Sequence, residues 1–180
     1  MEPCESIDSG DRAFLQVVDA ALAEAARRSG PWLVCRAGCT ECCLGPFPIT
    51  QLDARRLRLG LAELEAHDPG RAASVRERVR QAAGQMGDDD PCPALDLASG
   101  LCDLYAARPI LCRAFGPPVR CGSEEDLAVC ELCFQGASDS EIAACEAVID
   151  RDGLESALLD RLDQSTGACG ETTVALALST

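Results

Sequence analysis

The sequence predicts a mainly α-helical fold, a small single-domain helical bundle that contains an irregular cysteine-rich region. The chain has 180 residues and 47% of them are hydrophobic, which is enough for one buried core and too few for two independent cores. Aromatic residues make up only 3% of the chain. Leucine, alanine and valine must therefore fill the interior, and alanine-rich stretches favour helices over strands. We expect one domain over residues 1–180, with a cysteine-rich core at 30–135 flanked by N- and C-terminal helices.

Two helices are predicted in the first third of the chain. Apolar residues recur at helical spacing over residues 11–28, and Gly30 followed by Pro31 is a stop signal. Thr50 and Asp53 match a capping box, which predicts a helix from there to about residue 66. The solvated side of this second helix is expected to carry its three arginines, Arg55, Arg56 and Arg58.

A third helix is expected from about Pro69 to Met86, because its apolar residues share one face. Gly84, Gly87 and the acidic run 88–90 then break it. Three adjacent carboxylates after a helix are typical of a solvated loop, so we assign this run no function.

The second half of the chain is predicted to hold shorter elements. A short helix fits residues 109–114, where proline suits the first helical position. Ser138 and Glu141 match another capping box, followed by a helical face that carries Cys145. A last helix is expected over 154–162, and the tail at 172–176 is either a strand or a packed terminal segment.

The charge of the chain argues against several classes of partner. The formal net charge is −14 and the sequence pI is about 4.4, a balance that repels nucleic-acid phosphates and anionic lipid. Residues 1–6 contain no basic or apolar signal region, and no stretch approaches about 20 apolar residues. We therefore expect a cytoplasmic protein with no nucleic-acid or membrane partner, whereas a protein partner stays open.

The cysteine content points to metal ligation. Thirteen cysteines is an odd number, and without a secretion signal a disulfide framework is a poor interpretation. The single histidine, His67, lies at a polar helix end where we expect it to be exposed. A multi-ligand site must then be built almost wholly from thiolates, which favours zinc, iron–sulfur or copper(I) over calcium or magnesium.

The strongest local motif is Cys35-x3-Cys39-x2-Cys42-Cys43. A Cys-x2-Cys pair on a tight turn can direct two sulfurs to one metal, and a cysteine four residues earlier can add a third. Because Cys42 and Cys43 are adjacent, their side chains point in different directions, and the second sulfur can serve a multinuclear cluster. The motif leaves open which of the two is the direct ligand, and it also permits reduced core cysteines or a strained vicinal disulfide.

A second constellation consists of Cys92, Cys102 and Cys112, spaced ten residues apart. Such spacing is unsuited to a local knuckle and suits a site to which each residue contributes one sulfur. Arg108 and Arg113 could neutralise such a site and lower the pKa of its thiols, although ordinary salt bridges explain them equally well.

A third constellation, Cys121, Cys130 and Cys133, gives a possible second site. Cys130-x2-Cys133 fits either a metal-binding or a redox pair. Cys145 could complete four thiolates, but it is better interpreted as a core residue. Cys4 and Cys169, near the termini, are expected to be free thiols.

Taken in order, these motifs resemble the YkgJ-type cysteine-cluster family, which is described as a zinc- or iron-chelating domain. The resemblance spans about residues 30–135 and includes Cys102-Asp103-Leu104-Tyr105 and Arg108-Pro109-x2-Cys112-Arg113-x-Phe115. It implies a metal-chelating role, with zinc or an iron–sulfur cluster as cofactor, for seven cysteines: Cys35, Cys39, Cys42, Cys43, Cys92, Cys102 and Cys112.

Three functions remain open from the sequence. The first and favoured one is a metal-binding module. The second is an iron–sulfur enzyme or subunit in methyl transfer or redox chemistry, because a more distant relative of this family, the flagellin lysine N-methylase, resembles an iron–sulfur-dependent methyl-transfer enzyme. The third is a structural zinc module. The Cys-x3-Cys-x2-Cys spacing also equals that of radical S-adenosylmethionine enzymes and makes a [4Fe-4S] cluster sterically feasible, but the helical periods do not fit the barrel of those enzymes.

Overall fold

The computed structural model describes residues 3–82, 86–121 and 127–179 of the chain. These fall into two compact units, each made of two separate chain segments. We call residues 1–35 with 113–168 unit 1, and residues 36–112 with 169–180 unit 2. The single domain over residues 1–180 stays a prediction.

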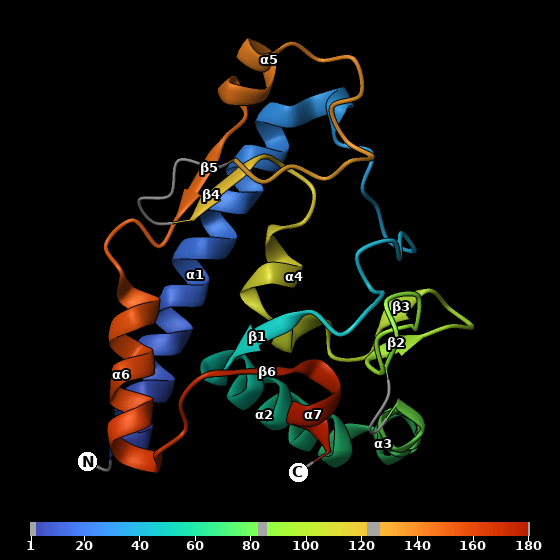
Figure 1. Cartoon of the computed structure of the whole chain (residues 1–180), viewed down its shortest axis with the longest axis vertical. Coiled ribbons are helices and arrows are strands. Elements are labelled where there is room, and N and C mark those ends of the chain that lie inside the picture. Colours follow the sequence, from blue (N-terminus) through green and yellow to red (C-terminus); the bar gives the residue numbers. More distant parts are fainter. Residues whose placement is uncertain (1–2, 83–85, 122–126, 180) are drawn as a thin grey trace. The chain divides into compact units, whose positions relative to one another are not determined.

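Helices dominate the described chain, as predicted, and the strands are short (Figure 1). In unit 1, helix α1 forms the longest element and is accompanied by a parallel strand pair, β4 with β5. The elements of unit 1 are α1 (Pro3–Ser29), η1 (Gly30–Trp32), β4 (Val119–Cys121), α5 (Asp139–Ala144), β5 (Ala147–Ile149) and α6 (Leu154–Thr166).

The core of unit 1 is the apolar face of α1 packed against α6 and β5. Phe14 and Val18 of α1 are almost fully buried, as are Leu158 and Leu162 of α6. The two helices approach closely at Gly10, where an added Cβ would lie 2.9 Å from Leu158 Cδ2. Burial of this leucine-, valine- and alanine-rich face stabilises the unit, as the composition predicted.

Unit 2 packs α2 and α3 against the C-terminal segment (Figure 1). Strand β1 pairs antiparallel with β6, which brings the C-terminal segment onto the helices. Its core includes Leu57 and Val75, and the half-buried Cys92 and Cys102 pack against it. The elements of unit 2 are β1 (Pro48–Thr50), α2 (Gln51–His67), α3 (Pro69–Ala82), β2 (Leu95–Asp96), β3 (Leu101–Cys102), η2 (Tyr105–Ala107), β6 (Glu171–Thr173) and α7 (Val174–Leu178), and α4 (Ile110–Ala114) begins in it.

Both predicted capping boxes are confirmed. The Thr50 hydroxyl accepts the Asp53 N–H at 3.2 Å, and the Ser138 N–H donates to Glu141 Oε2 at 2.8 Å. Each satisfies backbone groups that a helix start leaves without partners. His67 is exposed at the end of α2, as expected.

Two details of the predicted elements were wrong. Arg56 is 5% exposed rather than solvated, because it pairs with the buried Asp53. Helix α5 ends at Ala144, so that Cys145, expected on its face, follows the helix. The third helix is described over Pro69–Ala82, and its expected last turn falls on residues 83–85, outside the described part of the chain.

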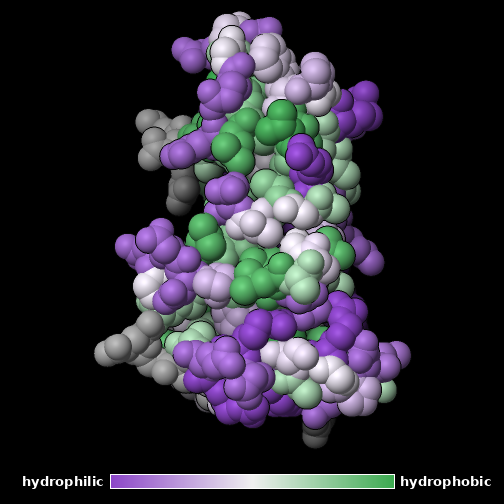
Figure 2. Space-filling model, turned by 90° about the vertical axis from the view of Figure 1, so that its right-hand side faces the viewer, coloured by the Kyte–Doolittle hydropathy of each residue, from purple (hydrophilic) through white to green (hydrophobic). Residues whose placement is uncertain are grey.

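No helix in the described chain combines the length and the apolar character that a bilayer-spanning segment requires. The apolar surface on the face shown in Figure 2 is broken up by hydrophilic side chains. Such scattered apolar residues are ordinary for a protein surface.

Candidate metal centre

In unit 2, backbone hydrogen bonds bring Cys43 and Cys92 together although they are far apart in the sequence. The Cys92 N–H donates to the Cys43 carbonyl at 2.8 Å, and the Gly45 N–H donates to the Asp90 carbonyl at 2.9 Å. An antiparallel bridge joins Leu44 to Pro91 between them. The cysteine motif and the second constellation are therefore held side by side by the main chain.

The hairpin of β2 and β3 adds Cys102 to the same region. Cys102 is paired with Leu95, whose own N–H donates to the Cys92 carbonyl at 2.9 Å. The turn of this hairpin lies against the motif loop, because a Cβ added at Gly100 would lie 3.4 Å from the Cα of Gly38. Both glycines have positive φ values of 68° and 86°, which other residues rarely adopt.

Helix α2 positions the segment that carries Cys112. Asp53 Oδ1 accepts the N–H of Ile110, the first residue of α4, at 3.0 Å, and it also accepts Arg56 Nη1 at 2.5 Å. Asp53 is only 3% exposed, so this bond is shielded from water. Nearby, Gly60 contacts Ala107 so closely that an added Cβ would lie 2.3 Å from the Ala107 Cβ.

Five thiols lie close enough together for their charges to affect one another's pKa: Cys42, Cys43, Cys92, Cys102 and Cys112. Burial, followed by the charges of Cys92 and Cys102, raises the pKa of Cys112. Burial raises the pKa of Cys92 to about 11, with Cys102 adding to the effect, and burial also raises the pKa of Cys102. Four chain segments thus contribute thiols to one neighbourhood.

Cys42 and Cys43 share a hydrogen bond that separates their protonation behaviour. The bond to Cys43 raises the pKa of the Cys42 thiol, and burial acts in the same direction. The same bond lowers the pKa of Cys43. Cys43 is therefore the thiol of the adjacent pair that deprotonates first.

Two arginines supply positive charge to these thiols. Arg108 lowers the pKa of Cys42 and Cys102, opposing the larger effects that raise them, and it lies 3.5 Å over the Tyr105 ring. Arg78 acts in the same way on Cys92 and Cys102. Of the two alternatives that the sequence left open for Arg108 and Arg113, Arg108 therefore fits charge compensation of the thiols.

Arg113 instead forms an ordinary salt bridge in unit 1, to Asp19 at 2.8 Å. Arg78 was missed by the sequence reasoning. It donates to the Pro93 carbonyl at 2.8 Å and to Asp103 Oδ2 at 2.5 Å. Its position on α3 gave no signal, because only the fold places that helix beside residue 93.

The predicted ligands do not all fall in one unit. Cys39 belongs to unit 2, where its N–H donates to the Arg36 carbonyl at 2.9 Å in the turn before Cys42. Cys35 belongs to unit 1. Among the described residues, no three histidine, cysteine, aspartate or glutamate side chains are already grouped so as to hold a metal ion.

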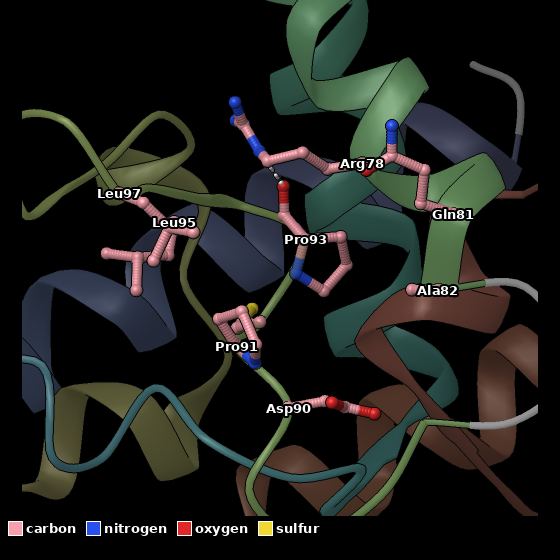
Figure 3. A pocket seen from close by; sticks show the side chains of 9 residues that line it. Arg78, Gln81, Ala82, Asp90, Pro91, Pro93, Leu95 and Leu97 are labelled. Atoms are coloured by element: carbon pink, nitrogen blue, oxygen red, sulfur yellow. Dashed lines mark hydrogen bonds between the residues drawn. The ribbon is translucent and has the colours of Figure 1, made fainter.

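A pocket of about 240 Å³ borders Cys92 in unit 2. Arg78, Gln81 and Ala82 of α3 line one side, and Leu95 and Leu97 line another (Figure 3). The bond from Arg78 to the Pro93 carbonyl crosses one end of it.

Unit 1 contains the third constellation. The Cys133 N–H donates to the Cys130 carbonyl at 2.9 Å in a tight turn, and Cys133 and Cys145 are buried in one apolar cluster. Cys145 is thus a core residue, as predicted. Cys121 lies on β4, in register with Ile149.

The prediction that Cys4 and Cys169 are free thiols can be compared with the structure at Cys169. Cys169 is an exposed free thiol, as expected. The side chain of Cys4 lies outside the described part of the chain.

Comparison with protein families identifies the chain. Residues 34–134, more than half of its length, match the model of the CxxCxxCC family, described as a "putative zinc- or iron-chelating domain". The chain belongs to the CxxCxxCC family. No curated protein and no solved structure matches it significantly.

The matched segment contains all the thiols discussed above except the two terminal ones and Cys145. The description of this family as zinc- or iron-chelating agrees with the expected metal binding and with the expected zinc- or iron-based cofactor, at that level. The donor chemistry of unit 2 fits these metals, because thiolates are ligands of both zinc and iron–sulfur clusters.

Proposed function

We propose that unit 2 binds a zinc ion or an iron–sulfur cluster and that the protein acts as a metal-binding module. The observation that carries this proposal is the mutual electrostatic influence of thiols from four chain segments, held together by main-chain pairing. The ligands are drawn from six cysteines of this unit: Cys39, Cys42, Cys43, Cys92, Cys102 and Cys112.

Charge balance supports this assignment. Several thiolates in a half-buried region repel one another, and a cation removes that cost. Arg78 and Arg108 already compensate part of the charge. A bound metal would supply the remaining positive charge. Its thiolate ligands would form a closed shell that holds the segments at 39–43, 92, 102 and 112 together. The thiols would have to turn toward the ion on binding, as rotation about χ1 allows.

Anaerobic purification with metal analysis and visible absorption tests the proposal. Zinc or iron in a fixed ratio to protein is the expected result, with a brown colour and acid-labile sulfide if the metal is an iron–sulfur cluster. Zinc found after aerobic purification does not distinguish the two, because zinc can replace a lost cluster in a thiolate site.

A pair of variants locates the ligands. The double substitution Cys43→Ser and Cys112→Ser should abolish metal binding, whereas Cys169→Ser, at an exposed thiol of the same unit, should leave it intact. Metal retention by the double variant, or a metal-free wild-type protein under anaerobic conditions, would contradict the proposal.

A second candidate function is an iron–sulfur enzyme or subunit, favoured by the pocket beside Cys92. A molecule in this pocket would lie next to a thiol of the proposed centre, which is the arrangement that methyl-transfer or redox chemistry at a cluster requires. Substituting Ala82 with Leu should narrow the pocket. If the protein is such an enzyme, this change should abolish substrate turnover while the metal content stays constant.

A further inference from the structure

Cys130 and Cys133 in unit 1 lie in surroundings unlike those of the proposed metal centre. Cys133 is 4% exposed and packs with Phe134 and Cys145, while Cys130 is half-buried at the edge of the same cluster. Cys130 is therefore the more exposed residue of the pair, and Cys133 is shielded from solvent.

The turn brings the two sulfurs within reach of a disulfide bond. The bond from the Cys133 N–H to the Cys130 carbonyl closes a β-turn, which keeps the two Cα atoms within about 7 Å. Disulfides span Cα separations of about 4.4–6.8 Å. The two side chains also share a hydrogen bond, so their sulfurs already face each other.

A segment distant in sequence holds the buried sulfur. The Cys133 sulfur accepts hydrogen bonds from the backbone N–H groups of Val34 and Cys35, and the Phe134 N–H donates to the Trp32 carbonyl at 3.1 Å. The segment that follows α1 and η1 therefore lies beside the segment that carries Cys133 (Figure 1).

We propose that Cys130 and Cys133 form a dithiol site for thiol–disulfide exchange with low-molecular-weight or exposed protein disulfides. This function is separate from the metal centre of unit 2. Cys130 loses its proton to solvent, and its thiolate attacks one sulfur of the substrate disulfide. The substrate S–S bond breaks, a mixed disulfide forms at Cys130, and the first leaving thiolate takes up a proton from solvent. Cys133 then loses its proton to solvent and attacks Cys130 Sγ; the mixed disulfide breaks, the internal disulfide forms, and the second leaving thiolate is protonated in the same way. The dithiol is oxidised by two electrons and the substrate disulfide is reduced to two thiols.

The chain contains a built-in reporter for this reaction. It has one tryptophan, Trp32, whose ring stacks on Phe134 with a centroid distance of 6.4 Å. Phe134 follows Cys133 directly, so forming the internal disulfide should change the fluorescence of this tryptophan.

Titration of the full-length protein in reduced and oxidised glutathione tests the proposal. Tryptophan fluorescence and alkylation followed by peptide mass spectrometry are measured in parallel. We expect both signals to change with one shared midpoint, with loss of two alkylatable thiols and a bond mapped to Cys130–Cys133.

Single variants separate the roles of the two cysteines. Cys133→Ser should accumulate a glutathione adduct at Cys130, and Cys130→Ser should abolish the transition without forming an adduct at Cys133. Cys145→Ala is the matched control, because it removes a buried thiol of the same cluster, and it should keep the transition.

Two results would overturn the proposal. One is that Cys130 and Cys133 stay reduced at every glutathione ratio. The other is that Cys133→Ser lowers the metal content of the protein, since the pair would then be metal ligands. Loss of metal from the unit 2 variants, with the fluorescence transition preserved, supports both assignments separately.

Discussion

The two units use the same side chain in two different settings. In unit 2 the thiols come from distant segments, are held by main-chain pairing and lie near Arg78 and Arg108. In unit 1 the pair Cys130 and Cys133 comes from one local turn inside an apolar cluster, with backbone N–H groups as its polar partners.

This difference teaches that the surroundings of a cysteine decide its chemistry. Thiols that converge near cations can lose several protons when a metal binds, because the metal and the cations balance the negative charge of the thiolates. Two thiols that share a turn can be oxidised in pairs without needing a cation. Each of the following substitutions alters one of the two settings, so that the other unit serves as an internal control.

The largest expected effect is at the anchor of α4. Substituting Asp53 with Ala removes a buried carboxylate that pairs with the buried Arg56, which should cost about 3–5 kcal/mol of unfolding free energy. It also removes the acceptor for the Ile110 N–H and should lower metal retention through Cys112.

The measurement is chemical unfolding of unit 2 followed through Tyr105, the one tyrosine of the chain, with Trp32 as the signal for unit 1. Asp88→Ala, at an exposed carboxylate, is the control. An Asp53→Ala protein as stable as wild type would show that Asp53 does not anchor the segment.

The next effect concerns the close contact of α2 with η2. In Gly60→Ala the new Cβ would lie 2.3 Å from the Ala107 Cβ, and the forced shift should cost about 1–3 kcal/mol. Metal content of the purified protein and thermal unfolding are the measurements.

Gly70→Ala is the matched control, because its Cβ would meet only the Asp68 side chain at an ordinary 3.5 Å. That helical change should be neutral or slightly stabilising. Equal behaviour of the two variants would show that η2 can move away without loss.

A smaller effect is expected from removing one cation. Arg108→Gln removes charge that lowers the pKa of Cys42 and Cys102, so metal must displace more tightly held protons. Affinity measured by chelator competition at pH 7 should fall about tenfold, the lower end of the range for outer-shell changes.

Exchange at Cys130 and Cys133 should be unchanged in this variant. Arg80→Gln, at an exposed pair with Glu77 on α3, should bind metal normally. An equal loss of affinity in both variants would indicate a general charge effect.

The smallest effect is the pH dependence of the metal-free protein. Burial raises the pKa of Cys92 from 9.0 to about 11, so the folded state keeps this proton longer than the unfolded state does. The resulting stability is fully present below pH 9 and is lost as pH rises through about 11. Denaturant unfolding at several pH values should show this decline, and Cys92→Ala should reduce it.

The sequence determined the helical character, the two capping boxes and the family. These depend on local periodicity, short-range caps and the order of cysteines, which are readable without tertiary contacts. It also determined that metal ligation would rest on thiolates, since the chain has only one histidine.

The tertiary structure decided how the cysteines are divided. Cys35 and Cys39 are four residues apart, yet they belong to different units, and within unit 1 the N–H of Cys35 is bonded to the sulfur of Cys133. Arg56, which spacing alone placed at the surface, is likewise a buried partner of Asp53. Partners of this kind are set by long-range packing, and periodicity within one segment carries no information about which distant segment will cover it.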